Sequence, residues 1–209
     1  MLALEDGTIY FGRAFGCRKT VVGEAVFNTS MTGYQEILTD PSYYQQIVAM
    51  TTSQVGNYGT NSEDLESSTP KVQGFVIKEC SQHFSNWRSE GSLSQYLEKH
   101  EIPGLEGIDT RALTKKLRSV GAMKCCLSTQ DIDQQQAVAL AQQWGGLEGV
   151  DYVKDVSSHI SYQWDADGKD STPFAIEGTN LTSHSTRDKT FKVAAYDFGA
   201  KLSIFRKLR

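Results

Sequence analysis

The sequence predicts an α/β fold of mixed α and β elements in one main domain. Three observations favour it: a turn signal between apolar runs at the start of the chain, several short runs rich in Val, Ile and Phe, and three segments with helical spacing of apolar residues. Helices interspersed with strands are typical of layered domains that combine the two. At 209 residues, the chain is long for one domain and short for two, against about 100–200 residues for each.

The first elements are predicted as strands. Asp6-Gly7 separates residues 2–5 from residues 8–13, and Asp-Gly between apolar runs is a strong signal for a β-hairpin. Further strands are expected at residues 21–27, 46–52 and 72–79, since each run is rich in β-branched or aromatic residues.

A short helix is expected to begin at Ser92, whose hydroxyl can accept hydrogen bonds from free backbone N–H groups. Leu93, Tyr96 and Leu97 follow at helical spacing, so we expect them to face the core.

A second helix is predicted after Asp109, which is a good N-cap residue, and Gly121 suits its C-terminal end. Its apolar stripe is expected to consist of Leu113, Leu117 and Val120. A strand is predicted next, at residues 122–127. A third helix is predicted at about residues 132–144, capped by Asp131 and ended by two glycines.

The composition changes after the third helix. Residues 157–189 are rich in Ser, Thr, Asp and Gly, with one short strand expected near residues 174–176. The apolar run 191–198, Gly199 and a helix at 203–208 follow, which is the pattern of a first strand–turn–helix of an α/β domain. We therefore expect a domain at 1–150, a connector at 151–190 and the truncated start of another domain at 191–209.

Charge and composition exclude several classes of protein. The 21 Lys and Arg residues against 25 Asp and Glu give a net charge of −4, without the basic run typical of nucleic-acid binding. No stretch approaches the roughly 20 apolar residues of a membrane span. A signal peptide would begin with basic residues followed by an apolar run, whereas here Glu5 and Asp6 follow directly after the first four residues. We expect a cytoplasmic protein that binds neither nucleic acid nor membrane.

The cysteines and histidines give no sign of a metal site. Cys17, Cys80, Cys125 and Cys126 lack C-x-x-C spacing, and the four histidines are scattered. In a cytoplasmic protein such cysteines are expected to be small buried apolar side chains.

The most unusual stretch is residues 27–44, FNTSMTGYQEILTDPSYY, which we term the hydroxyl-rich segment. It carries six small hydroxyl or amide side chains and very little charge, at Asn28, Thr29, Ser30, Thr32, Thr39 and Ser42. Because buried polar groups need partners, the segment forms either an internal hydrogen-bond network or the wall of a polar pocket. The residues alone favour the network and leave the pocket open.

Other polar motifs have plain structural interpretations. Residues 56–61, GNYGTN, lack the lysine and the spacing of a phosphate-binding loop, so a turn with left-handed glycines is expected. Glu24 and Glu36 have no acid–base partner in the pattern and are expected at the surface or in hydrogen bonds. Arg111 is expected on the polar side of its helix, where it could form an ion pair.

The hydroxyl-rich segment resembles the signature of the small, glutamine-hydrolysing chain of the carbamoyl phosphate synthetase family. The resemblance spans nearly the whole chain, because further stretches follow in that family's order: LALEDGTIYFGRAFG, VGNYGTN, GFVIKEC, GIDTRALTKKLR and KVAAYDFGAK. It implies a layered β/β/α domain of the swivelling type, followed by the start of a class I glutaminase domain.

The resemblance also implies partners and limits on chemistry. The family's small chain supplies ammonia from glutamine to a large subunit, on which ATP and metal ions are expected. In this chain we expect no cofactor and no catalytic residue, because the nucleophilic cysteine of such glutaminases lies in a G-x-C-x-G turn that the sequence lacks. The alternatives are another class I amidotransferase and a non-enzymatic interaction module.

Ser42 is the single candidate for substrate contact. The resemblance implies that the serine of the Asp40-Pro41-Ser42-Tyr43 turn contacts bound glutamine. The alternative is a plain β-turn, since Asp and Pro suit its first two positions. Both can hold, because a rigid turn can position a hydroxyl.

Overall fold

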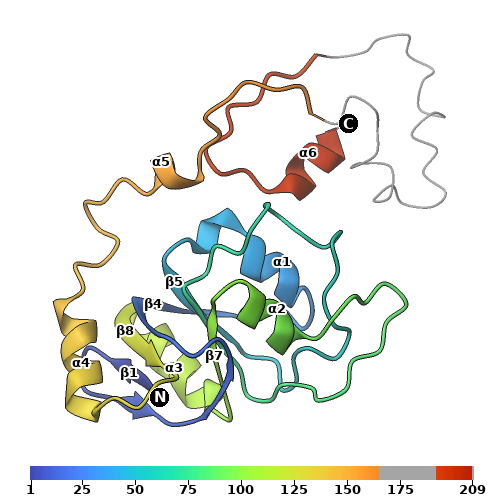
Figure 1. Ribbon diagram of the computed structural model, residues 1–209. Helices are drawn as coiled ribbons and strands as arrows, with labels where there is room; N and C mark the ends of the chain where they lie inside the picture. The colour runs from blue at the N-terminus through green and yellow to red at the C-terminus, as the bar shows by residue number, and fades with distance from the viewer. Residues whose placement is uncertain (165–191, 209) are drawn as a thin grey trace. The chain divides into compact units, whose positions relative to one another are not determined.

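The computed structural model describes residues 1–164 and 192–208, which divide into two compact units, Met1–Val150 and Asp151–Arg209. The predicted strand near residues 174–176 and most of the predicted connector lie outside the described residues. Figure 1 shows the described residues of both units.

The first unit contains one eight-stranded mixed sheet in the order β2-β1-β8-β4-β5-β6-β7-β3. The strands are β1 Leu2–Leu4, β2 Ile9–Tyr10, β3 Arg13–Gly16, β4 Thr20–Asn28, β5 Gln46–Met50, β6 Gly74–Val76, β7 Pro103–Glu106 and β8 Met123–Ser128. The strands from β4 to β7 are mutually parallel, whereas β1, β2, β3 and β8 pair antiparallel with their neighbours. The mixed α/β fold is therefore confirmed.

Alternate residues along the strands enter different cores, because successive side chains of a strand point to opposite faces. Ile47 and Ala49 of β5 pack with α3 (Thr110–Val120), whereas Val48 and Met50 pack with α1 (Tyr34–Thr39) and α2 (Leu93–Lys99). A third core lies under α4 (Gln134–Gln143), which contacts β1 and β8 (Figure 1).

The N-terminal hairpin is confirmed. The Leu4 N–H donates to the Thr8 carbonyl at 2.8 Å, and Gly7 takes a φ of +88° in the turn. Its second strand is shorter than predicted. After β2 the chain leaves this edge of the sheet and forms β3 at the opposite edge, beside β7.

The three predicted helices are present, with two corrections. Ser92 caps α2 in a capping box with Gln95, and Asp109 caps α3. Val120 is wrongly predicted as buried: it is the last residue of α3 and its side chain is 66% exposed. The N-cap of α4 is Asp133 rather than Asp131, because the helix begins two residues later than predicted.

The structure also contains elements that the sequence did not predict. Helix α1 and the 3-10 turn η1 (Pro41–Tyr43) both lie within the hydroxyl-rich segment. Strand β7 begins at a proline and contains Gly104, where a side chain would lie 2.6 Å from the ring of Phe15.

The second unit contains two short helices, α5 (Val153–Val156) and α6 (Leu202–Leu208). The helix predicted at 203–208 is confirmed. The predicted strand at 191–198 is wrong over its described part, because residues 192–198 form no strand. Val193 and Tyr196 are 64% and 88% exposed, and the Trp164 ring packs on Phe205 with 5.4 Å between centroids.

Across the two described ranges, no helix has both the length and the hydropathy that crossing a membrane requires.

Candidate functional site

The hydroxyl-rich segment begins with an exposed turn. Residues 29–32 follow strand β4 and are exposed, and the side-chain oxygen of Asn28 accepts a hydrogen bond from the Ser30 N–H at 2.7 Å. The side-chain amide of Asn28 donates to the Tyr43 hydroxyl at 2.9 Å. Asn28 therefore connects the turn, through hydrogen bonds, to Tyr43 near the C-terminal end of the segment.

Two tyrosines connect helix α1 to the loop at residues 56–61. The Tyr58 hydroxyl accepts hydrogen bonds from the N–H groups of Gly33 and Tyr34, at 2.7 and 3.2 Å. The Tyr34 hydroxyl donates to the Gly59 carbonyl at 2.5 Å. Burial raises the pKa of both phenols, so both remain protonated. Tyr58 thus caps a helix whose N-cap, Gly33, has no side chain.

Gln35 and Thr39 fix the next part of that loop. The fully buried side chain of Gln35 donates to the Asn61 carbonyl at 2.5 Å and accepts from the Asn61 N–H at 2.9 Å. It therefore bonds both backbone groups of Asn61, as the backbone of a neighbouring β-strand would. The Thr39 hydroxyl accepts from the Glu66 N–H at 2.9 Å, and the Ser67 hydroxyl donates to the Thr39 carbonyl at 2.6 Å. The buried side chains of Gln35 and Thr39 therefore form a network with residues 61–67, as the sequence favoured.

The loop at residues 56–61 is a turn with left-handed glycines, as predicted. Gly56 and Gly59 have φ angles of +90° and +72°. A side chain at Gly59 would also lie 2.7 Å from the Gly91 carbonyl and overlap Ser89. Both the backbone conformation and the lack of space therefore require glycine at this position.

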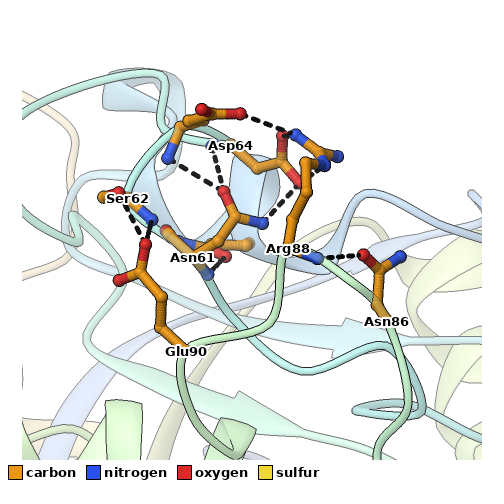
Figure 2. Close-up of polar contacts among 8 residues, drawn as sticks. Asn61, Ser62, Asp64, Asn86, Arg88 and Glu90 are labelled. Carbon is orange, nitrogen blue, oxygen red and sulfur yellow. Dashed lines mark hydrogen bonds and ion pairs between the residues drawn. The ribbon is translucent and has the colours of Figure 1, made fainter.

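A second polar cluster connects residues 61–64, at the end of this loop and just after it, to residues 86–90 (Figure 2). Arg88 donates to both carboxylate oxygens of Asp64, at 2.9 and 3.0 Å, and pairs with Glu63 at 3.2 Å. The side-chain oxygen of Asn61 accepts from the N–H groups of Glu63 and Asp64, and its amide donates to Asp64 at 2.8 Å. These bonds within the chain satisfy the charged groups of the cluster.

The two acidic residues noted in the sequence have different surroundings. Glu24 is an acceptor, receiving a 2.7 Å hydrogen bond from the side chain of Gln46. Glu36 is half-buried, and within the described ranges its Oε2 atom is buried without a hydrogen-bond partner. Burial, with smaller contributions from Asp64 and Glu66, raises the pKa of Glu36.

Ser42 lies at the surface in a rigid turn. The Asp40 side chain accepts a hydrogen bond from the Ser42 N–H at 2.9 Å, and Pro41 occupies the first position of η1. Ser42 is exposed. Asp40 and Pro41 therefore set the backbone of the turn, while the serine side chain extends outward. The Asp-Pro-Ser-Tyr motif forms a 3-10 turn here.

The remaining candidates are structural. The four cysteines are free thiols, with Cys125 and Cys126 buried as predicted and Cys17 and Cys80 half-buried. No group of three His, Cys, Asp or Glu side chains in the described ranges could hold a metal ion. Arg111 is exposed and forms no ion pair with any residue that the structure describes.

The part of the chain that carries the sheet and this network matches a known family. Residues 2–127 match the family described as the carbamoyl-phosphate synthase small chain, CPSase domain. The chain belongs to this family.

Curated small chains of carbamoyl phosphate synthase are similar to the whole chain. It is 46% identical to that of Syntrophotalea carbinolica over 208 residues, which is 100% of this chain and 54% of the relative. The Akkermansia muciniphila small chain is 45% identical over 209 residues, and the Rhodopirellula baltica one 48% over 208; the chain covers 53% and 54% of them. The chain thus spans about half the length of these relatives.

Proposed function

We propose that the chain forms the N-terminal part of the glutamine-hydrolysing small subunit of carbamoyl phosphate synthase. In the intact protein, hydrolysis of glutamine supplies ammonia to the large subunit, which makes carbamoyl phosphate for the synthesis of arginine and pyrimidines. The observation that supports this proposal most strongly is the match of the small-chain family to residues 2–127, which make up most of the first unit.

In this proposal the two units have different roles. The first unit is a β/β/α swivelling-type domain that docks on the large subunit and forms one side of the glutamine site. Residues 191–209 begin the glutaminase domain, after a connector at 151–190. The catalytic cysteine, its base and the oxyanion donors lie outside these 209 residues. The protein acts in the cytoplasm, and ATP and metal ions bind to the large subunit.

Ser42 is the residue of this chain that we assign to glutamine binding. Its hydroxyl is at the surface and its backbone is fixed by Asp40 and Pro41. A hydroxyl on a rigid turn can bond to the charged amino-acid end of glutamine with little loss of conformational freedom. The internal network supports this assignment, because it holds the turn without using the Ser42 hydroxyl.

The proposal is tested with the full-length protein and its large subunit. We expect the pair to form carbamoyl phosphate with either glutamine or ammonium as nitrogen source, and the large subunit alone to use ammonium only. If adding the full-length protein does not confer use of glutamine, the proposed function is wrong.

A further inference from the structure

A small pocket lies where the parallel strands of the sheet begin. Its volume is about 290 Å³, close to the lower limit of typical ligand sites. The lining comes from three segments that precede or begin β4, β6 and β7: Lys19, Val21, Thr69, Pro70, Val72, Gln73, His100, Glu101 and Ile102. None of these residues belongs to the hydroxyl-rich segment.

The rim of the pocket carries two opposite charges, on Lys19 and Glu101, whereas its apolar residues expose little surface. Val72 and Ile102 are each 6% exposed, and Val21 is half-buried. The Lys19 ammonium and the Glu101 carboxylate lie 3.7 Å apart, with side chains 48% and 79% exposed. An exposed ion pair this long contributes little to stability, so a ligand can separate its members at small cost.

The backbone of Glu101 has a conformation that is unusual for a residue with a side chain. The residue follows the end of α2 in a Schellman motif: the Glu101 N–H donates to the Glu98 carbonyl, and the Ile102 N–H to the Leu97 carbonyl. The φ of Glu101 is +57°, a conformation for which glycine is the usual residue. Glycine would complete the same motif without the strain that a glutamate side chain brings.

A second strained residue supports the same pocket. The φ of Gln45 is +63°, and its side-chain oxygen accepts a 2.6 Å hydrogen bond from the Gln73 amide, which lines the pocket. Gln45 and Glu101 are the non-glycine residues with positive φ in the described ranges. Backbone strain of this kind concentrates at functional sites.

We propose that this pocket binds a free α-amino acid through its charged ammonium and carboxylate groups. Lys19 pairs with its carboxylate and Glu101 with its ammonium group. A zwitterion has one negative and one positive charge, which can pair with Lys19 and Glu101 respectively. A ligand with a single charge would pair with one of these residues only.

His100 adds a neutral polar group to the rim. Burial and the neighbouring Lys99 lower its pKa, so the imidazole is uncharged at neutral pH. Its ring lies on that of Tyr96, with 4.6 Å between centroids. The net charge of the rim is then set by Lys19 and Glu101, which cancel as the charges of a zwitterion do.

The test uses the full-length protein and three probes: L-leucine, N-acetyl-L-leucine, which lacks the ammonium group, and L-leucine methyl ester, which lacks the carboxylate. Binding is measured by calorimetry and by the NMR signal of the His100 imidazole, assigned with His100→Gln. We expect leucine to bind at millimolar concentration and to shift that signal. Each derivative should bind roughly tenfold to a hundredfold more weakly, the range expected for one lost charged hydrogen bond.

Two variants separate binding from folding. Lys19→Met and Glu101→Gly should each weaken leucine binding by the same factor of roughly ten to a hundred. Glu101→Gly should melt at or above the temperature of the wild type, since it relieves backbone strain. Lys19→Met should fold normally, because the hydrogen bonds of Lys19 to Thr129 use its backbone N–H and carbonyl.

The controls are Ser42→Ala, which should bind leucine as the wild type does, and Glu98→Gln, which changes a nearby carboxylate that does not line the pocket. The proposal is overturned if leucine does not shift the His100 signal. It is equally overturned if either derivative binds as tightly as leucine, or if both rim variants retain full affinity.

Discussion

Tyr34 and Tyr58 lie stacked with 4.2 Å between ring centroids, and the hydroxyl of each bonds to backbone next to the other tyrosine. Tyr34 donates to the carbonyl of Gly59, and Tyr58 accepts from the N–H groups of Gly33 and Tyr34. A six-residue helix is too short to be stable alone, so α1 depends on contacts of this kind. The pair fixes the helix that leads into the Ser42 turn.

Tyr58→Phe should therefore lower the free energy of unfolding by about 1–3 kcal/mol, because it leaves two N–H groups at the start of α1 without their acceptor. Chemical denaturation of the 1–209 chain measures the change. Tyr10→Phe is the matched control, since Tyr10 is half-buried and its hydroxyl has no hydrogen-bond partner in the described ranges. Equal losses in the two variants would show that the Tyr58 hydroxyl is not a cap.

The tyrosine pair also shows why the sequence predicted some elements and not others. Helices α2 and α3 have a capping side chain immediately before them and apolar residues at helical spacing, so local reasoning finds them. Helix α1 has glycine as its N-cap and receives its capping hydroxyl from Tyr58, 24 residues after Tyr34. No local pattern contains that contact.

The other differences also have tertiary causes. Strand β7 contains Gly104, which weakens a local strand prediction but permits close contact with the Phe15 ring. The run at 192–198 has a strand-like composition, but the residues that the structure describes in its unit include no strand with which it could pair. For the candidate site, the sequence indicated a buried network and singled out Ser42. It could not identify the bonding partners, which lie in loops 24–28 residues away.

Arg88→Met should destabilise the first unit by about 1 kcal/mol. The guanidinium of Arg88 bonds both oxygens of Asp64, whose side chain is 13% exposed, and this geometry makes an ion pair worth more than most surface pairs. Arg13→Met is the control, because Arg13 is 77% exposed and should lose no more than about 0.5 kcal/mol. The difference, measured by denaturation, should shrink in high salt. A difference that is insensitive to salt would exclude an electrostatic origin.

Glu36→Gln should stabilise the fold at neutral pH by about 1 kcal/mol, because it removes a buried charge with an unpartnered oxygen. The pKa of Glu36 is raised in the folded state, so the native protein favours the protonated acid and ionisation above that pKa costs stability. The gain should decrease as the pH falls through the folded pKa and vanish below the unfolded one. Melting temperatures at several pH values measure this, and a gain independent of pH would contradict it.

The 1–209 chain alone should release no ammonia from glutamine. Cys125 and Cys126 are buried, and burial also raises the pKa of the half-buried Cys80 thiol to about 11, so these side chains are poor nucleophiles. Ammonia is measured after incubating the purified chain with glutamine, with heat-treated chain as the control. Release that persists through repeated purification would place catalytic groups within these residues.

Ser42→Ala in the full-length protein should impair the use of glutamine much more than folding. Loss of a hydrogen bond to a charged end of the substrate costs about 1.5–3 kcal/mol, or roughly tenfold to a hundredfold in kcat/KM. The loss should appear mainly in KM if the bond is equally strong in the ground state and the transition state. Stability should change by no more than about 0.5 kcal/mol, since Asp40 and Pro41 set the turn and the serine side chain is exposed.

Synthesis from ammonium, measured with the large subunit present, is the internal control for Ser42→Ala and should be unchanged, because it does not require glutamine hydrolysis. Asp40→Ala is the complementary variant: it removes the acceptor of the Ser42 N–H and should affect both stability and glutamine use. If Ser42→Ala keeps kcat/KM for glutamine at the wild-type value while Asp40→Ala lowers it, the turn positions a neighbouring group, and the Ser42 hydroxyl does not contact the substrate.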